Sequence, residues 1–357
     1  MKLYSVILCG GRGERFWPGS RRSLPKQFVT LFGKRSLLQA TSDRVRSLCP
    51  PDRQLFVAGA EFGPVLKKQL PVASRNLVFE PFGRNTAPAI GLAAIRLAQR
   101  DKNAVMAVLP ADHLVEDRKA FLACLRFAAR LAEKGLLVTF GIPPTRPDTG
   151  YGYVQSGARV ASSGRLAGFE VKGFREKPDA ATARKYLKSG DYYWNSGMFV
   201  WRVDAILAAF RAHMPAFYAD LERYGAAIGT RREGRELARL YDRAESISID
   251  YAVMEKARNI AVVRATFDWD DVGSWLALDR HMPKDRQGNV VGQRGLASDS
   301  GSCIVQTDAG IVAVLGCSNL VVVRSGDAVL VAHKDKLGGI KGLLAEIGRN
   351  KDMGRFL

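Results

Sequence analysis

The chain has 357 residues, 47% of them hydrophobic and 25% charged, which is the composition of a globular protein with room for one large domain and a small one. No apolar run approaches the ~20 residues that a membrane-spanning helix needs, so we expect no membrane segment. The formal net charge of +19 is strongly basic, but the arginines are spread along the chain rather than gathered in one arm. This argues against a nucleic-acid partner and favours small polyanionic substrates.

The number and spacing of the cysteines restrict which disulfide or metal sites the chain can form. The five cysteines are scattered, and none forms a Cys-x-x-Cys pair, so the sequence predicts neither a disulfide framework nor a zinc site. A reducing, cytoplasmic location fits this pattern.

The first half of the chain alternates short apolar runs with amphipathic segments. Strands are predicted at residues 6–8, 55–58, 77–79, 105–109 and 136–140. Helices are predicted at residues 36–47, 87–100 and 119–134, where apolar residues recur every three or four positions. Alternation of this kind indicates a mostly parallel sheet with helices on both faces.

The second half is less regular. We expect a hairpin around residues 163–164, shorter strands near Val171 and Met198, helices at 203–223 and 233–243, and a strand at 260–265. After residue 289, regularly spaced strands are predicted at 303–306, 311–315, 320–323 and 329–332, and then an amphipathic helix at 342–348. We expect two domains, residues 1–284 and 285–357. The strand spacing of the second fits either a sandwich fragment or the coils of a β-helix.

The segment after the first predicted strand is rich in glycine and arginine, namely Gly10, Gly11, Arg12, Gly13 and Arg15. Glycines let the backbone approach an anion closely, and the arginines add positive charge, so this is a candidate phosphate-binding loop. A plain tight turn is the alternative. Lys26 follows a short loop later, either as a second phosphate ligand or as an ordinary surface lysine.

A carboxylate and a helix start follow the third predicted strand. Glu80 lies at the carboxyl end of that strand, where open α/β sheets bind ligands. Its two oxygens could accept hydrogen bonds from the adjacent N1–H and amine donors of guanine, a donor pair that adenine lacks. Asn85 and Thr86 precede the helix, and Thr86 is expected to cap it. Capping alone would also explain both residues.

Two more strand ends carry carboxylates. Asp112 follows the fourth predicted strand, and Asp270 and Asp271 follow the last strand of the first domain. Mg²⁺ is normally held by one or two carboxylates together with substrate phosphates, so Asp112 with one of the other two would suffice. The structural alternatives are a helix cap at Asp112 and a turn at Asp270 or Asp271. His113 is expected to orient its loop rather than bind metal.

Polar residues in the middle of the chain suit a second substrate. Glu176 and Asn195 suit the hydroxyl groups of a sugar, and Lys177 suits a phosphate. Taken alone, Glu176 and Lys177 would be interpreted as a solvated ion pair.

Taken in chain order, these segments resemble the mannose-1-phosphate guanylyltransferase family of sugar nucleotidyltransferases. The resemblance is carried by residues 10–18, 25–28, 80–89, 110–113, 149–153, 174–178, 194–199 and 268–275. It implies an α/β fold: a Rossmann-like, GT-A-like mixed sheet flanked by helices, with a small C-terminal left-handed β-helix. The sequence departs from the family pattern at Gly19. It also lacks the histidine motif of a fused isomerase half, so we expect no phosphomannose isomerase activity.

The resemblance also implies roles for individual residues. It assigns the nucleotide to Gly10, Gly11, Arg12, Gly13, Glu80, Asn85 and Thr86, and the sugar phosphate to Gly152, Glu176, Lys177 and Asn195. It assigns the metal to Asp112 and Asp271, with Asp271 preferred to Asp270 because it directly precedes Val272 and Gly273. Arg15, Lys26 and Lys177 would be the catalytic cations.

The implied reaction joins GTP to α-D-mannose 1-phosphate in the presence of Mg²⁺, giving GDP-mannose and pyrophosphate. No protein nucleophile is expected, because the sugar phosphate is already anionic and positioning with charge neutralisation suffices. The alternatives are a nucleotidyltransferase for another sugar 1-phosphate, a non-catalytic regulatory protein that binds a nucleotide sugar, and an RNA-binding protein driven by the basic charge. The C-terminal domain either pairs two subunits in a homodimer or only covers the catalytic domain.

Overall fold

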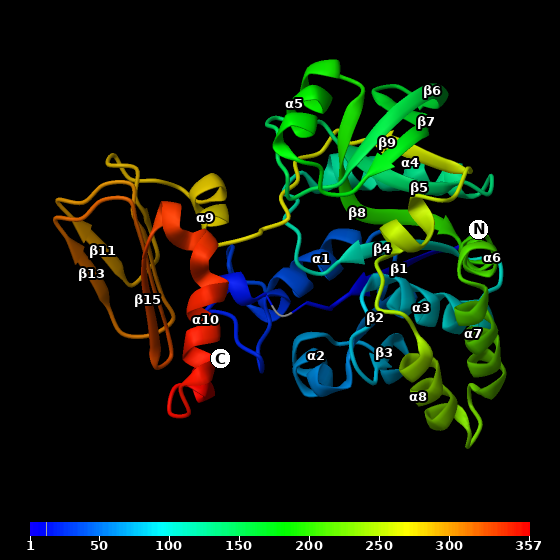
Figure 1. The fold of residues 1–357 in the computed structure, drawn as a ribbon, viewed down its shortest axis with the longest axis horizontal. Helices are drawn as coiled ribbons and strands as arrows, with labels where there is room; N and C mark the ends of the chain where they lie inside the picture. The colour runs from blue at the N-terminus through cyan, green and yellow to red at the C-terminus, as the bar shows by residue number, and fades with distance from the viewer. Residues whose placement is uncertain (12) are drawn as a thin grey trace. The chain divides into compact units, whose positions relative to one another are not determined.

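The alternation of strands and helices produces a nine-stranded sheet in the computed structural model, which describes residues 1–11 and 13–357 (Figure 1). The spatial order is β3-β2-β1-β4-β8-β5-β9-β7-β6. The strands are β1 (Leu3–Leu8), β2 (Gln54–Gly59), β3 (Leu77–Glu80), β4 (Val105–Pro110), β5 (Leu137–Ile142), β6 (Tyr153–Ser163), β7 (Leu166–Arg175), β8 (Tyr192–Arg202) and β9 (Ile260–Arg264).

The sheet is mixed rather than parallel throughout. Strands β1 to β4 pair in parallel, as the alternating sequence predicts. β8 runs antiparallel to both β4 and β5, and the hairpin β6–β7 adds antiparallel pairs at the other edge. The expectation of a mostly parallel sheet therefore holds for one half, and the mixed sheet that the resemblance implied describes the whole.

The helices are α1 (Leu37–Val45), α2 (Gly63–Gln69), α3 (Thr86–Arg100), α4 (Arg118–Ala132), α5 (Ala180–Ser189), α6 (Val203–His213), α7 (Pro215–Ala227), α8 (Glu233–Arg243), α9 (Leu276–His281) and α10 (Ile340–Arg349). The prediction of one helix over residues 203–223 is wrong, because the chain breaks at Met214, which precedes a proline and has φ −138°. No helix within the described residues is long and apolar enough to cross a membrane.

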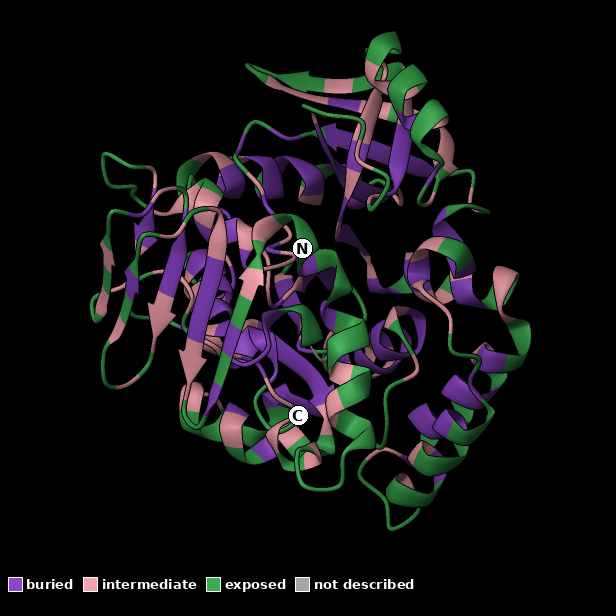
Figure 2. Ribbon diagram, turned by 60° about the vertical axis from the view of Figure 1, so that its left-hand side comes forward, coloured by how far each residue is buried: buried purple, intermediate pink, exposed green. Residues whose placement is uncertain are grey.

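Both faces of the sheet are covered, as expected. Along β4, Met106 and Val108 belong to the apolar cluster that contains α3, α6 and α7, whereas Val105, Ala107 and Leu109 belong to the cluster that contains α4. This alternation follows from the two-residue period of a strand. Figure 2 shows the central strands as buried and the outer sides of the helices as exposed.

The C-terminal strands form stacked coils. They are β10 (Val290–Val291), β11 (Gly295–Ser298), β12 (Ile304–Thr307), β13 (Val312–Leu315), β14 (Leu320–Ser325) and β15 (Ala328–His333). Val290, Ile304 and Val321 stack in parallel register in one sheet, while β11 pairs in parallel with β13 in another. Successive strands thus alternate between two sheets, which is a β-helix-like arrangement and not a sandwich fragment. β15 ends the stack by pairing antiparallel with β14.

The described chain groups into two compact units that interleave along the sequence. The first comprises Met1–Gly10, Thr41–Ala111 and Val115–Trp269, and the second comprises Gly11–Ala40, Asp112–Leu114 and Asp270–Leu357. The predicted domain boundary at residues 284 and 285 divides the sequence differently and stays a prediction.

Candidate active site

A polar pocket of about 410 Å³ lies in the second unit. It is lined by Gly13, Glu14, Arg15, Phe16, Lys26, Asp112, His113, Asp271, Gly273 and Lys341. The fold therefore brings the predicted triphosphate segment together with both predicted metal carboxylates, although these residues are widely separated in the sequence. We call this the phosphate pocket.

Lys26 lines this pocket and is buried rather than exposed on the surface. Its Nζ lies 2.9 Å from Oδ2 of Asp112, and it donates to the main-chain oxygens of Asp271 at 2.9 Å and Val272 at 2.7 Å. An ammonium group has three hydrogens, so all of them have acceptors. Desolvation of Asp112 opposes its ionisation, but the charges of Lys26 and His113 together with the Lys26 hydrogen bond outweigh it and hold the Asp112 pKa below its usual value.

Asp270 and Asp271 have different surroundings. The Asp270 carboxylate is buried and accepts hydrogen bonds from the Val272 amide and from the guanidinium of Arg280, and it contacts His281 Nε2 at 2.9 Å. It therefore stabilises the local turn, as the structural alternative proposed. Asp271 lines the phosphate pocket instead, which supports the preference for Asp271 as the metal ligand.

Gly13 is needed at its position for steric reasons. It has φ 62°, and a Cβ built there would lie 2.3 Å from the Cβ of Lys26, so a side chain would displace the buried lysine. Its carbonyl accepts a hydrogen bond from the Ser20 hydroxyl at 2.5 Å. Gly10 and Gly11 have open space where a Cβ would be, and Arg12 lies outside the described residues.

Glu80 ends β3 in the first unit and is buried. The Tyr241 hydroxyl donates to its Oε1 at 3.1 Å. Burial raises the pKa of Glu80 to about 7, although the Tyr241 hydrogen bond acts in the opposite direction. A carboxylate that accepts hydrogen bonds from guanine must be ionised, and this environment makes its ionisation sensitive to pH near neutrality.

The start of α3 differs in one detail from the expectation. Asn85, with φ 67°, is the residue that caps the helix, and its Oδ1 accepts from the Thr86 amide at 2.8 Å. Thr86 is already inside the helix, where its Oγ1 accepts from the Ile249 amide at 2.9 Å. The prediction that Thr86 caps α3 is therefore wrong. Its hydroxyl instead connects α3 to the segment before Asp250.

The predicted sugar-phosphate residues lie close together in the first unit. The Asn195 amide donates to the Gly152 carbonyl at 2.8 Å, and a Cβ built at Gly152 would lie only 2.2 Å from Oε2 of Glu176. The Glu176 carboxylate therefore occupies the space that a side chain at Gly152 would fill. Lys177 pairs with Glu176 Oε1 at 3.1 Å while its side chain stays 62% exposed, so the ion pair considered from the sequence is present.

Asp250 completes this group and was not found from the sequence. Its Oδ1 accepts from Nδ2 of Asn195 at 2.8 Å, and the Asn195 Oδ1 accepts from the Thr139 hydroxyl at 3.1 Å. Burial and the nearby Glu176 charge raise the Asp250 pKa to about 6. The residue begins a π-helical turn, Asp250–Met254, a feature common at functional sites.

Comparisons with known proteins identify the family of this chain. The family described as Nucleotidyl transferase matches residues 4–288, and the MannoseP isomerase/GMP-like beta-helix domain matches residues 293–347. A mannose-1-phosphate guanylyltransferase from Klebsiella pneumoniae is 39% identical over 98% of this chain and 74% of its own length. The chain belongs to the mannose-1-phosphate guanylyltransferase family of nucleotidyl transferases.

Other relatives of this nucleotidyl transferase extend the comparison. The alginate biosynthesis protein AlgA of Pseudomonas aeruginosa is 38% identical over 97% of this chain and 72% of its own length. A solved structure from Thermus thermophilus, described as a mannose-1-phosphate geranyltransferase, is 38% identical, covers 97% of this chain and 99% of its own, and superposes with a TM-score of 0.88. The chain thus shares its fold with this solved structure.

Three residues of this nucleotidyl transferase that belong to the candidate groups were not identified from the sequence. Tyr241, Asp250 and Lys341 reach the candidate groups from helices or turns whose sequences show only ordinary amphipathic patterns. Only Asp250 had a usable signal, because an aspartate next to Tyr251 inside an apolar run is unusual unless it has a buried partner.

Proposed function

We propose that this protein transfers GMP from GTP to α-D-mannose 1-phosphate, forming GDP-mannose and pyrophosphate. The observation that carries the proposal is the phosphate pocket, where Gly13 and Arg15 line the same space as the carboxylates of Asp112 and Asp271. A phosphate oxygen of mannose 1-phosphate attacks the α-phosphorus of GTP, and the bond from that phosphorus to the pyrophosphate oxygen breaks. No covalent enzyme intermediate is needed.

Asp112 and Asp271 fit a divalent cation, which we propose to be Mg²⁺. Both carboxylates line one polar pocket, and oxygen ligands of this kind suit a hard cation. The described residues contain no group of three or more His, Cys, Asp or Glu side chains arranged to hold a metal, so substrate phosphates would complete the ligand set. When bound, the cation would neutralise charge on the phosphates.

Residues of the chain itself are assigned to bind and position the substrates. Gly13 lines the pocket and leaves room for the buried Lys26, and Arg15 supplies positive charge. Lys26 holds Asp112 and the main chain of residues 271 and 272 in place, a positioning role rather than the direct phosphate contact expected from the sequence. Glu80, Asn85 and Thr86 are together assigned to the guanine base.

The group formed by Gly152, Glu176, Asn195 and Lys177 is assigned to mannose 1-phosphate. Glu176 and Asn195 offer acceptors and donors to sugar hydroxyls, and the exposed Lys177 offers a cation to the phosphate. A non-catalytic regulatory protein would have no need for Arg15, Lys26, Asp112 and Asp271 together, so we favour the enzyme over that alternative.

Pyrophosphate release by the purified protein tests the proposal. GTP, ATP, UTP and dTTP are each combined with mannose, glucose and fucose 1-phosphates and Mg²⁺, with EDTA as the control. Release confined to GTP and mannose 1-phosphate and abolished by EDTA is expected. Turnover with another pair would replace the specificity assignment, and release by no pair would favour the regulatory alternative.

We also propose a homodimer formed through the C-terminal domain. On β15 the alternate residues Val329 and Val331 are 54% and 63% exposed, which leaves an apolar stripe on the outer face. Sedimentation analysis of the wild type and of Val331→Lys tests this. The variant should sediment as a monomer, whereas a monomeric wild type would show that the domain only covers its own chain.

A further inference from the structure

Lys341 lines the phosphate pocket from the C-terminal helix α10. Ile340 is buried in the apolar core of the second unit, and Leu344, one turn later, packs against the same core. These two residues fix the rotation of α10, so the neighbouring Lys341 is presented at the pocket and stays exposed. The placement follows from the packing of the helix rather than from an ion pair of the lysine itself.

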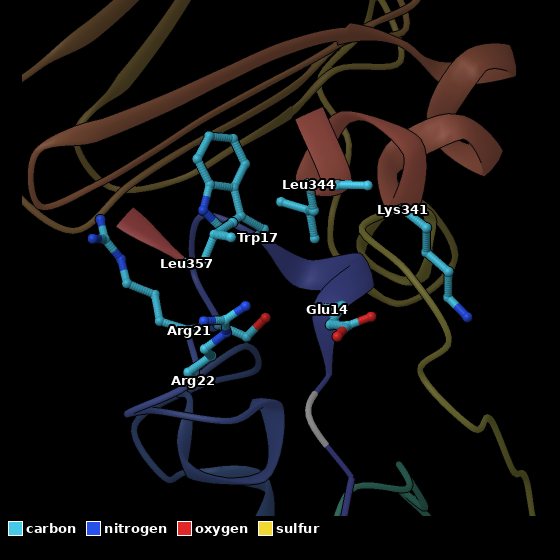
Figure 3. A pocket seen from close by; sticks show the side chains of 9 residues that line it. Glu14, Trp17, Arg21, Arg22, Lys341, Leu344 and Leu357 are labelled. Atoms are coloured by element: carbon cyan, nitrogen blue, oxygen red, sulfur yellow. The ribbon is translucent and has the colours of Figure 1, made fainter. Parts of the chain in front are cut away.

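Glu14 and Lys341 also border a second, smaller pocket of about 250 Å³, which is otherwise lined mainly by Trp17, Arg21, Arg22, Leu344 and Leu357. Figure 3 shows Lys341 leaving α10 on the side away from Leu357, with its ammonium group pointing away from Trp17. The side chain therefore extends out of this smaller, more apolar space. The phosphate pocket is the other space that it borders.

The charged residues that line the phosphate pocket leave Lys341 available to bind an anionic substrate. Among the pocket's described lining residues, the cations Arg15, Lys26 and Lys341 face the acids Glu14, Asp112 and Asp271. Lys26 has all three hydrogens bound to protein acceptors. Arg15 and Lys341 are then the lining cations left for a substrate, since neither side chain forms an ion pair within the described part of the chain.

We propose that Lys341 binds the β- and γ-phosphates of the nucleoside triphosphate and the pyrophosphate that leaves. This inference rests on the proposed function and adds the C-terminal domain to the nucleotide site. A lysine on its flexible stem suits this task, because it binds phosphate as a point charge without a fixed geometry. The pyrophosphate portion carries most of the charge of the triphosphate, so an added cation acts most strongly there.

The test compares Lys341→Met with Lys336→Met, a matched control that removes one exposed lysine from the turn just before α10 and lines neither pocket. Calorimetric binding of magnesium pyrophosphate and the KM values for both substrates are measured. Loss of one charge-assisted contact should weaken pyrophosphate binding and raise the KM for GTP about tenfold, with a much smaller change in the KM for mannose 1-phosphate. Lys341→Arg should retain most of the binding.

Equal pyrophosphate binding by Lys341→Met and Lys336→Met would overturn the inference, as would a wild type that does not bind pyrophosphate at all. If Lys341→Met folds poorly, Lys341→Gln gives the same comparison. The binding measurement also separates this inference from the proposed function. A wild type that binds pyrophosphate through Lys341 but does not join GTP to mannose 1-phosphate would retain the inference and reject the proposed substrates.

Discussion

Lys26 and Asp112 form an ion pair of 2.9 Å within the second unit, and the same ammonium group holds the main-chain oxygens of Asp271 and Val272. One buried lysine thus ties together the two segments that carry the candidate metal carboxylates. Lys26 is buried, whereas the Asp112 side chain is 29% exposed, so removing either partner leaves a partly desolvated charge without compensation.

We therefore expect Lys26→Met to lower the free energy of unfolding by about 1–3 kcal/mol, the cost of leaving a partly buried acceptor without its partner. Asp112→Asn should cost much less in the Lys26→Met background than in the wild type, with a coupling energy on the order of 1–3 kcal/mol. Urea unfolding of the wild type, both single variants and the double variant measures this coupling. Additive effects would show that the pair does not act as a unit.

Substitution of the two adjacent aspartates should affect different properties, catalysis for one and stability for the other. Asp271→Asn should reduce kcat by orders of magnitude while leaving the thermal midpoint nearly unchanged, because its carboxylate lines the phosphate pocket. Asp270→Asn should lower the thermal midpoint instead, since it weakens the buried contacts to Arg280 and His281. Kinetics over a range of Mg²⁺ concentrations, together with melting curves, distinguish them. A reversed pattern would make Asp270 the metal ligand.

Gly152→Ala tests the sugar-phosphate group. The new methyl would lie 2.2 Å from Oε2 of Glu176, so the carboxylate must move from its present position. We expect the KM for mannose 1-phosphate to rise at least about tenfold, the effect of misplacing a substrate-positioning group. Gly234→Ala in α8 is the matched control, because nothing lies within 4 Å of its added methyl. Similar kinetics for the two variants would remove Gly152 and Glu176 from the site.

Glu80 predicts a pH-dependent stability. Its pKa is raised from 4.5 to about 7 in the folded protein, so the folded state binds more protons than the unfolded state across that window. The free energy of unfolding of the wild type should then fall as the pH rises from 4.5 to about 7. Glu80→Gln has no titrating group at this position and should not lose stability in this way. Its free energy of unfolding relative to that of the wild type should therefore rise by up to ~3 kcal/mol over the same pH range.

Urea unfolding of the wild type and Glu80→Gln at several pH values measures the effect, with the exposed Glu346→Gln on α10 as the control. Parallel stability curves for the wild type and Glu80→Gln would contradict a raised pKa. GTP binding by the wild type should strengthen over the same pH range if the ionised carboxylate accepts hydrogen bonds from the base.

Local patterns were enough to predict much of the fold. The helix α8 (Glu233–Arg243) has the bounds that the sequence predicts, because its apolar residues recur with a strong helical period. The break at Met214 was missed although Pro215 signals it. No comparable pattern signals α5 (Ala180–Ser189), whose only buried residue is Ala183, so it has almost no apolar face to recognise.

The candidate site was predictable only in part. Strand ends identify Asp112 and Glu80, because polar residues after buried strands collect at one edge of a sheet. The partners that set their chemistry are far away in the sequence, with Tyr241 beside Glu80 and Lys26 beside Asp112. Such pairings depend on how whole elements pack, and no short sequence pattern encodes them.

The neighbouring positions of Asp270 and Asp271 also limit which insertions and deletions the loop that carries them can accept. Asp270 pairs with Leu114 in an extended bridge, and consecutive residues of extended chain point to opposite sides. A single codon gained or lost between β9 and Val272 would shift this register by one residue, so that the loop could no longer place one carboxylate in the turn and the next in the pocket. We therefore expect the length of this loop to be as constrained as the identity of its two aspartates.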